Sequence, residues 1–590
     1  MREAFGAKPV KPGSETARGQ NRHRLFDRAV LFLLLGWCCF NWCSTAIHVV
    51  RYYNPLPVSD YWRVIEDVPL IQTGDFSWLW RQHNEHRILF PEIVFALDHL
   101  LFAGRQILPV VISSCCYIGA IFILGRKFWC DANTSITLKT QALVLGGVIT
   151  GWPLSVYVLG TPFLLPWTLL QLAVVLALAS AVRFAENSGP HWLAICITSA
   201  VVATYSVANG VLLWPILLTV AVLLHAPRSR LIALAVAAAI SVGVFFVGYQ
   251  RPGVPLLASI QHPVYSIGFV LSYFSMPFGA LRQPAFGLAF GLVSLTLWAT
   301  CIARNFRRPR RASPFFVVAS GYFGFLLLTA GLTSVARVNL ADSGFGNAKA
   351  TRYLTFPLLG WAVLVAFTLA LAYRPRWRTF STRVILVGAM IVVGFMQIRL
   401  GRWLRINDSY VAFQQWAAIS LQNDVYDTAF LGSVFPEEAF IEHFLPLLRK
   451  GHKSIFADPV VETIGRDFRS LFHLAKSERE AGGVLRITPV KEGVSVVGWA
   501  ANLDRGGRDT VLLVDGLGEI VGFGRHLRAG VPQQLRSLPA KTSQTWVGFI
   551  NRQYGSSSFA PYIVDLKAKI ASPFAHSIKI PAESGTDPQL

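Results

Sequence analysis

The feature that most constrains the fold is the length of the apolar runs in this chain. The runs hold roughly 17–25 residues, which is the length that crosses a bilayer as a helix. Hydrophobic residues make up 53% of the chain and charged residues only 15%, whereas a soluble domain carries about 25% charged residues. The sequence therefore predicts an all-α polytopic membrane bundle of about 11 transmembrane helices. The candidate spans are residues 29–50, 107–125, 140–159, 164–184, 192–208, 211–226, 231–249, 286–303, 315–335, 354–373 and 383–399.

Two apolar segments leave the number of spans open. The run Trp192–Leu224 is longer than one span needs, and Asn209-Gly210 favours a break into two helices. The segment Val264–Gly279 is then a re-entrant or interfacial piece. Alternatively, the first run forms one tilted helix and the second is a true span. Both versions place the loop Arg51–Gln106 and the C-terminus on the same, outer side.

The basic charge of the chain is unevenly distributed. The formal net charge is +22, and most basic residues stand in short loops between the apolar runs. The loop Arg51–Gln106 instead holds seven acids against five bases. Because short cytoplasmic loops carry an excess of Lys and Arg, this asymmetry places the N-terminus in the cytoplasm and the loop Arg51–Gln106 outside. The basic clusters are read as topology signals, so no nucleic-acid partner is expected.

Composition changes divide the chain into four parts. Residues 1–28 are polar and are expected to be a disordered cytoplasmic segment, and residues 29–400 form the membrane domain with its long first outer loop, 51–106. Residues 401–482 read as a helical segment outside the membrane. Residues 483–590 alternate apolar and polar positions between Gly, Asp and Pro turns, which predicts a small β-sandwich-like domain, also outside.

Asp60 is the first candidate for chemistry, about ten residues beyond the first span. Its neighbours Tyr61 and Trp62 suit a membrane interface. A carboxylate there could act as a general base for an acceptor hydroxyl or bind a divalent cation. The structural alternative is an N-cap on a short helix that runs through Leu70.

The same loop contains a dense polar motif, His83-Asn-Glu-His-Arg87. If the motif is helical, His83 and His86 share one face and Arg87 stands beside His83. Two histidines without a third ligand are a weak metal signal, so the metal is left unknown. Glu85 is the better candidate, as a second catalytic acid or a contact to the acceptor. The structural alternative is a surface loop with partner charges.

A second polar cluster lies between the spans 315–335 and 354–373. Arg337, Lys349 and Arg352 precede Tyr353, and such cations near the bilayer suit a phosphate group. The alternative is an Arg-Tyr pair that anchors the interface. Asn209, at the expected helix break, would face the same side.

The architecture resembles the GT-C class of membrane glycosyltransferases over about residues 29–400. The resemblance is carried by a long first outer loop with an early Asp, about ten spans and a soluble outer domain. The blocks Gln82–Ile88, Ala208–Gly210 and Thr351–Tyr353 also resemble a group of bacterial membrane proteins of this shape. The resemblance implies a polyprenyl-phosphate sugar donor, a catalytic carboxylate at Asp60 and a place in the bacterial inner membrane. The chain lacks the Asp-Asp or Asp-Glu pair of the class after Asp60.

The expected function is transfer of a hexosyl or pentosyl group from a polyprenyl phosphate to an envelope glycan, lipid or protein. Asp60 would be the base and Glu85 an auxiliary acid, while Arg337 and Arg352 would hold the phosphate. His83, His86, Arg87, Asn209, Lys349 and Tyr353 complete the expected substrate contacts. A divalent cation between Asp60 and Glu85 is left open. The alternatives are an envelope-lipid transporter or flippase, and a non-catalytic membrane assembly protein.

Overall fold

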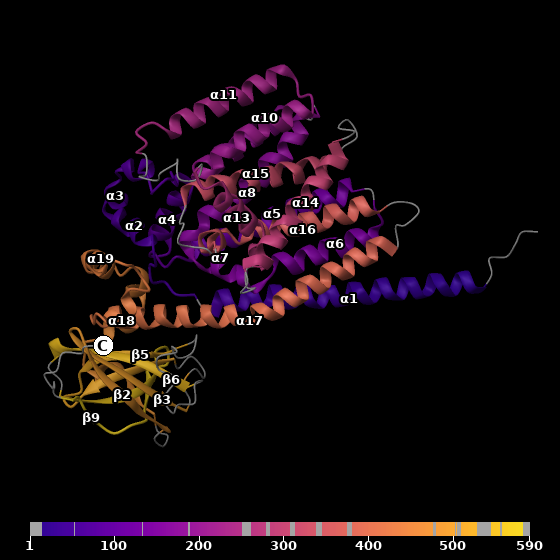
Figure 1. Cartoon of the computed structure of the whole chain (residues 1–590). Helices are drawn as coiled ribbons and strands as arrows, with labels where there is room; N and C mark the ends of the chain where they lie inside the picture. The colour runs from indigo at the N-terminus through magenta and orange to yellow at the C-terminus, as the bar shows by residue number, and fades with distance from the viewer. Residues whose placement is uncertain are drawn as a thin grey trace, which may run out of the picture.

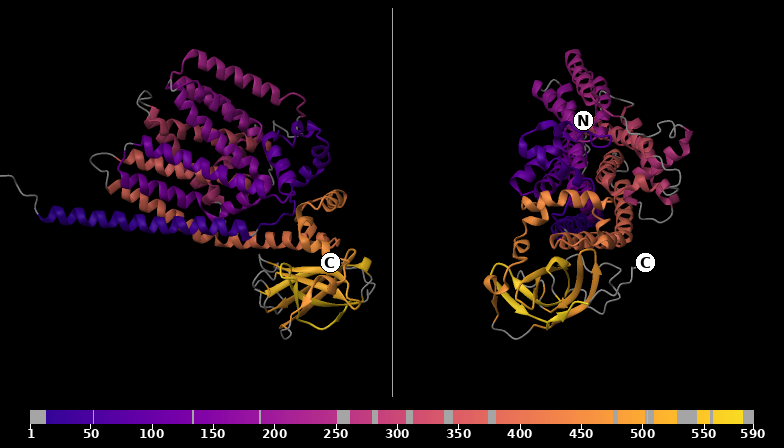
Figure 2. Two further views of the ribbon diagram at one scale, coloured as in Figure 1. Left: turned by 180° about the vertical axis from the view of Figure 1, so that it is seen from behind. Right: turned by 90° about the vertical axis from the view of Figure 1, so that its left-hand side faces the viewer.

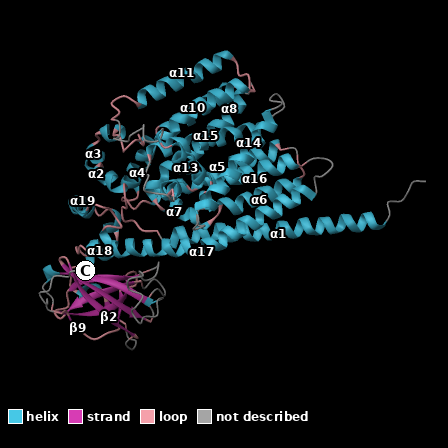
Figure 3. Cartoon of the chain, viewed as in Figure 1, coloured by secondary structure: helices cyan, strands magenta, loops and turns pink. Residues whose placement is uncertain are grey.

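The chain folds into a helical bundle followed by a β-sheet domain, as the computed structural model shows (Figure 1). Every described strand lies after residue 472 (Figure 3). The structure describes residues 14–51, 53–132, 134–186, 189–250, 261–278, 284–306, 313–337, 345–373, 380–475, 480–501, 503, 509–527, 544–554 and 557–581.

Helices of very different length make up the bundle. They are α1 (Ser14–Arg51), α5 (Ile107–Asp131), α6 (Ile136–Thr150), α7 (Val156–Gly160), α8 (Leu165–Ala185), α9 (Pro190–Thr204), α10 (Leu213–Leu223), α11 (Arg228–Phe245), α13 (Pro263–Phe274), α14 (Pro284–Phe306), α15 (Pro314–Ala336), α16 (Thr355–Ala372) and α17 (Phe380–Gln422). Among the described residues, eight helices are long and apolar enough to cross a membrane. The prediction of a polytopic helical membrane protein is confirmed at this level, while the expected 11 spans stay unconfirmed.

The expected count depends on helices that are short or broken. The segment 140–159 is not one straight helix, because α6 and the helical segment Pro153–Gly160, which includes α7, meet at an angle of 46°. Pro153, which lacks a backbone N–H, stands at this bend. The predicted break at Asn209-Gly210 is present, but α9 and α10 have only 15 and 11 residues. Helix α13 has 12 residues, roughly 18 Å, too short to cross the bilayer alone.

Helix α8 lies at the centre of the bundle and α11 at its edge. Within the candidate span of α8, 78% of the residues are buried, against 22% for α11. Helices α15 and α16 pack in the same apolar core as α8. The central position matters for function because the first turn of α8 carries Trp167 to the end of the bundle where the charged residues gather.

Helices α1 and α17 run side by side along one edge of the bundle (Figure 1, Figure 2). Trp37 Nε1 donates to Gln397 Oε1 at 2.7 Å, and Arg383 lies 2.9 Å from Asp27. Residues 14–28, expected to be disordered, form the start of α1, whereas residues 1–13 lie outside the described residues. Helix α17 has 43 residues, roughly 65 Å, so it continues well past its apolar half into the C-terminal region.

The loop Arg51–Gln106, called the outer loop after its predicted side, is a set of short helices at one end of the bundle. It contains α2 (Tyr61–Glu66), α3 (Val68–Thr73), η1 (Phe76–Trp80) and α4 (Leu89–Leu101). The C-terminal domain lies at the same end (Figure 1).

The helical segment after the bundle connects this loop to the sheet. Its elements are α18 (Thr428–Leu431), α19 (Glu438–Lys450), η9 (Ser454–Ala457), η10 (Pro459–Thr463) and α20 (Phe468–Leu471). One apolar core joins Trp62 of α2, Trp416 of α17 and Phe549 of the sheet. Ser59 N also donates to Val434 O at 2.7 Å. This contact with the C-terminal segment fixes the position of Ser59, the residue before Asp60.

The sheet has the strand order β1-β8-β7-β4-β5-β6-β3-β2, with β9 paired to β7. The strands are β1 (His473–Leu474), β2 (Gly482–Val490), β3 (Gly493–Ala500), β4 (Thr510–Asp515), β5 (Ile520–His526), β6 (Thr545–Asn551), β7 (Ser558–Asp565), β8 (Ile570–Pro573) and β9 (Ile578–Lys579). The expected sandwich of two sheets is instead one continuous sheet. Its far edges approach each other, because Glu480 N donates to Pro573 O at 3.2 Å. Both faces are buried because one encloses its own core and the other packs on α17.

Gly210→Ala is expected to destabilise the chain because the glycine allows a close helix crossing. A Cβ at Gly210 would lie 1.9 Å from the carbonyl oxygen of Ala203, whereas a Cβ at Gly324 of α15 meets nothing within 4 Å. We expect Gly210→Ala to cost about 1–3 kcal/mol and to lower the melting temperature in detergent. Gly324→Ala, the matched control, should be neutral or slightly stabilising. Equal melting temperatures for both variants would contradict the close crossing.

Candidate functional site

One cavity of about 620 Å³ at the loop end of the bundle collects most of the predicted site residues. Its lining includes Asp60, His83, Glu85, His86, Asn209, Arg337, Arg352 and Tyr353. They come from the outer loop, from η4 (Ala208–Leu212), from the end of α15 and from η8 (Thr351–Tyr353). Segments separated by nearly 300 residues therefore meet at one place. Arg87 and Lys349 are outside the lining.

The motif around Glu85 is a tight turn, which corrects the helical interpretation. His83 N donates to His86 O at 2.9 Å, and His86 N donates to His83 O at 2.8 Å. Asn84 has a φ of 50°, a left-handed conformation that Asn adopts more readily than most residues. The two histidines are thus paired across a two-residue turn, with Glu85 at its tip.

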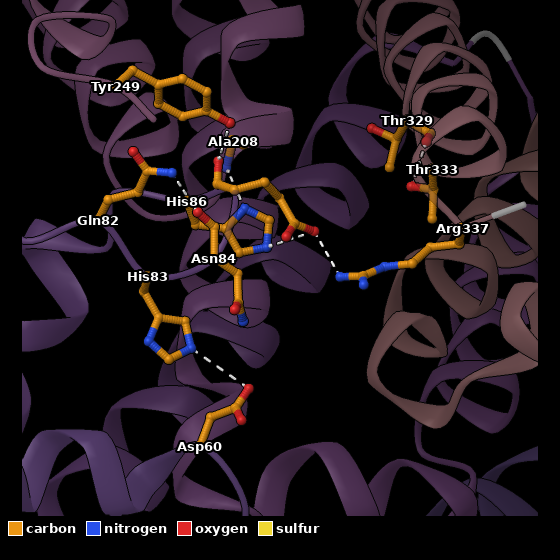
Figure 4. Close-up of polar contacts among 11 residues, drawn as sticks. Asp60, Gln82, His83, Asn84, His86, Ala208, Tyr249, Thr329, Thr333 and Arg337 are labelled. Atoms are coloured by element: carbon orange, nitrogen blue, oxygen red, sulfur yellow. Dashed lines mark hydrogen bonds and ion pairs between the residues drawn. The ribbon is translucent and has the colours of Figure 1, made fainter. Parts of the chain in front are cut away.

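The turn places the carboxylate of Glu85 between a cation, Arg337, and an imidazole, His86; Figure 4 shows both of these partners. Arg337 Nη2 lies 2.6 Å from Glu85 Oε1. His86 Nδ1 accepts a hydrogen bond from Ala208 N at 3.2 Å, so the proton of the neutral ring is on Nε2, which lies 3.6 Å from the same carboxylate. Burial lowers the pKa of His86 to about 4. His86 is therefore neutral at physiological pH, and Arg337 balances the charge of Glu85.

Asp60 occupies the N-cap position of α2 but does not act as a side-chain cap. No hydrogen bond runs from its carboxylate to the helix, which ends at Glu66 and not at Leu70. Asp60 Oδ2 instead lies 3.5 Å from His83 Nε2. The nearby imidazole of His83 is the main cause that lowers the pKa of Asp60, and burial opposes it. The carboxylate is thus ionised; it lines the cavity and points toward His83 (Figure 4).

Arg352 is the cation with the fewest partners at this site. Its guanidinium lies 5.1 Å from the ring centroid of Tyr353, and within the described parts of the chain no carboxylate pairs with it. The ring of Tyr353 is held edge-on against Trp167 at 5.0 Å. The positive charge of Arg352 also helps to lower the pKa of Asp60. An anion in the cavity would therefore find this guanidinium unoccupied.

Asn209 and Arg87 differ in whether their side-chain donors are left to bind a ligand. Asn209 is buried, lines the cavity, and its Nδ2 has no hydrogen-bond partner among the described residues. Arg87 is buried as well, but its guanidinium donates to three backbone carbonyls, including that of Phe245 at 2.8 Å. Asn209 is thus placed to contact a substrate. Arg87, expected to do the same, holds the loop in position.

Neither the apolar wall of the cavity nor Glu92 is recognisable as part of a site from the sequence alone. The wall includes Phe163, Trp167, Val211, Leu332 and Val335, which look like ordinary core residues in the sequence. Glu92 stands in the first turn of α4, and burial raises its pKa to about 8. A carboxyl group within the apolar sequence Leu89–Leu101 was the only signal that could have revealed it.

The described residues contain no group of three or more His, Cys, Asp or Glu placed to hold a metal ion. The open question of a divalent cation between Asp60 and Glu85 thus gains no support from the geometry. Comparison with protein-family models, with curated proteins and with solved structures finds no match to this chain. The functional argument therefore rests on the site itself.

Glu92→Gln is expected to remove a pH-dependent loss of stability. The carboxyl group of an unfolded chain ionises near 4.5, whereas that of folded Glu92 does so near 8. Between these values the folded state holds a proton that the unfolded state has released, so stability falls as pH rises. Thermal unfolding in detergent should give the variant a melting temperature roughly a few degrees above wild type at pH 8.5 and a similar one at pH 5. Parallel pH profiles of the two proteins would contradict the buried, protonated Glu92.

Proposed function

We propose that the chain is an integral-membrane glycosyltransferase that uses a polyprenyl-phosphate sugar. The observation that carries the proposal is that an ionised carboxylate, Asp60, and the guanidinium of Arg352, which pairs with no carboxylate among the described residues, line the same largely apolar cavity. The acceptor is an envelope glycan, lipid or protein. The proposed location is a bacterial inner membrane, with this end of the bundle and the sheet domain on the outer side.

The walls of the cavity suit a lipid-borne donor. Leu332, Val335 and Ala336 belong to the last turn of α15, a candidate membrane span, and Val211 and Leu212 to η4. A prenyl chain would replace water along these apolar side chains, which is favourable in proportion to the area covered. The sugar phosphate of the donor would then lie in the part of the cavity that Asp60 and Arg352 line.

The phosphate would be held by Arg352, with Arg337 as a second cation. A guanidinium forms paired hydrogen bonds to phosphate oxygens, and these are stronger than neutral hydrogen bonds. Arg337 is already paired with Glu85, so its charge is partly balanced. Arg352 would therefore stabilise most of the negative charge that develops on the leaving phosphate.

In the proposed reaction, the acceptor hydroxyl gives its proton to a carboxylate oxygen of Asp60. The hydroxyl oxygen forms a bond to the anomeric carbon of the donor sugar. The bond from that carbon to the phosphate oxygen breaks, and its electron pair leaves with the polyprenyl phosphate. Attack from the side opposite the phosphate inverts the anomeric centre. A general base of this kind typically contributes about 10²–10⁴-fold to the rate.

Glu85 and Asn209 would orient the sugar. Arg337 and the neutral His86 fix the Glu85 carboxylate from two sides, leaving acceptor positions for a sugar hydroxyl. The Nδ2 of Asn209, which has no hydrogen-bond partner among the described residues, would donate to another hydroxyl of the sugar. Both groups are positioned by the contact between the turn and η4, since Ala208 N donates to His86.

Asp60→Asn should abolish measurable transfer while the chain stays folded. The assay uses the purified chain in nanodiscs with a panel of radiolabelled polyprenyl-phosphate hexoses and pentoses, and the expected loss is about 10²–10⁴-fold. Asp75→Asn is the matched control, because Asp75 lies on the same loop outside the cavity and accepts a hydrogen bond from Ser77 N. Full activity of Asp60→Asn, or an equal loss in both variants, would contradict the assigned base.

Arg352→Met should weaken donor binding. Loss of a charge-assisted contact to phosphate is expected to raise the KM for the donor about 10- to 100-fold, and to weaken inhibition by free polyprenyl phosphate in parallel. Arg183→Met, which removes an exposed cation paired with Glu186 on α8, is the control. Unchanged inhibition by polyprenyl phosphate would show that Arg352 does not hold the phosphate.

A further inference from the structure

A second cavity, of about 340 Å³, lies beside the first. It is lined by Arg63, Glu66, Asp67, Arg81, Gln82, His83, Asn84 and Glu92. His83 and Asn84 line both cavities, so the tight turn is the wall between them. The first cavity has a largely apolar lining and the second consists of charged and amide side chains, so the two suit different ligands.

The charges of the second cavity balance one another. Arg81 Nη1 lies 3.3 Å from Glu66 Oε1 and 2.7 Å from Asp67 Oδ1. Arg63 supplies a second cation, and its guanidinium lies 6.0 Å from the ring centroid of Phe440 on α19. Two carboxylates thus face two guanidiniums. This balance favours an uncharged polar ligand over an anion or a cation.

Glu92 supplies a hydrogen-bonding group that the protein leaves unused. Its side chain is buried, at 8% exposure, and Oε2 has no hydrogen-bond partner among the described residues. Because burial raises the pKa of Glu92 to about 8, the group is a neutral carboxyl that can both donate and accept. A buried polar atom without a partner is costly, and a ligand hydroxyl would satisfy it.

We propose that the second cavity is the acceptor subsite and that it binds the terminal, uncharged sugar of a hydrophilic acceptor. This inference rests on the proposed transfer reaction. The cavity volume is at the lower end of ligand pockets, which suits one or two sugar rings. His83 lies between this cavity and Asp60, whose carboxylate is 3.5 Å from His83 Nε2. An acceptor hydroxyl that extends past the turn His83–His86 would therefore reach Asp60 in the first cavity. There it would face the donor sugar on the side away from the phosphate.

The test combines equilibrium binding with transfer, using the full chain in nanodiscs. The acceptor probes are the methyl glycosides of glucose, galactose and mannose, with methyl glucuronide as the charged counterpart and diacylglycerol vesicles as the lipid counterpart. Binding is measured by calorimetry without donor. The variants are Glu92→Leu, Glu92→Gln and Glu66→Ala. Glu186→Gln, just after the end of α8, is the control because its side chain is exposed and outside both cavities.

At least one neutral methyl glycoside should bind saturably. Glu92→Leu should weaken its binding about tenfold, and Glu66→Ala about threefold or more. Glu92→Gln, which keeps a donor and an acceptor, should stay within about threefold of wild type. In the transfer assay, the KM for the acceptor should rise with the dissociation constant while the KM for the donor stays unchanged.

Different results separate the two proposals. Unaltered glycoside binding in Glu92→Leu and Glu66→Ala, or preference for methyl glucuronide or diacylglycerol, would overturn the acceptor subsite while leaving the transferase intact. Glycoside binding that depends on Glu92 in a chain that transfers no sugar from any donor would overturn the transferase and keep a sugar-binding cavity. Transfer without glycoside binding would overturn the subsite alone.

Discussion

The candidate site depends on one buried cation, Arg87, which fixes the outer loop to the bundle. Its side chain is almost completely buried, stacks 4.6 Å from the ring centroid of Trp80, and donates to carbonyl oxygens that include those of Phe245 and Val247. These carbonyls lie at and just beyond the C-terminal end of α11, where the helix dipole is negative. Burying a charge is costly unless hydrogen bonds satisfy it, so the loop has one strongly preferred position. Gln82, which exchanges hydrogen bonds with Gln250, holds the other end of the turn.

The membrane accounts for where the chemistry can occur. In hydrocarbon, backbone groups must be paired within helices and charges are costly, so ionisable side chains collect at the ends of the bundle. In this chain they collect where the loop, η4, the end of α15 and η8 meet, and an apolar wall from the same helices continues from them. A substrate with a charged head and a long apolar chain matches this arrangement better than a soluble one. The sheet domain is attached to the same end through α17, where Asn423 accepts from Phe523 N and donates to Phe523 O.

Much of this arrangement could be predicted from the sequence because hydrophobic length and charge asymmetry act locally. Asp60, Glu85, Arg337 and Arg352 were expected on one side, and they line one cavity. The features that the sequence did not predict depend on tertiary contacts. Nothing local shows that Arg87 binds carbonyls 158 residues away. The turn at Asn84 replaces a helix because η4 and Arg337 hold its side chains. Glu92 acquires its protonated state only through burial in the folded chain. Whether alternating strands form one sheet or two is decided by which edges pair.

The most direct test of the central claim is a cryo-electron microscopy structure of the chain in nanodiscs loaded with a polyprenyl phosphate. The account predicts phosphate density beside Arg352 and Arg337, with the first prenyl units along Leu332 and Val335 of α15. Density for the lipid phosphate elsewhere on the protein, with this cavity empty at saturating lipid, would contradict it.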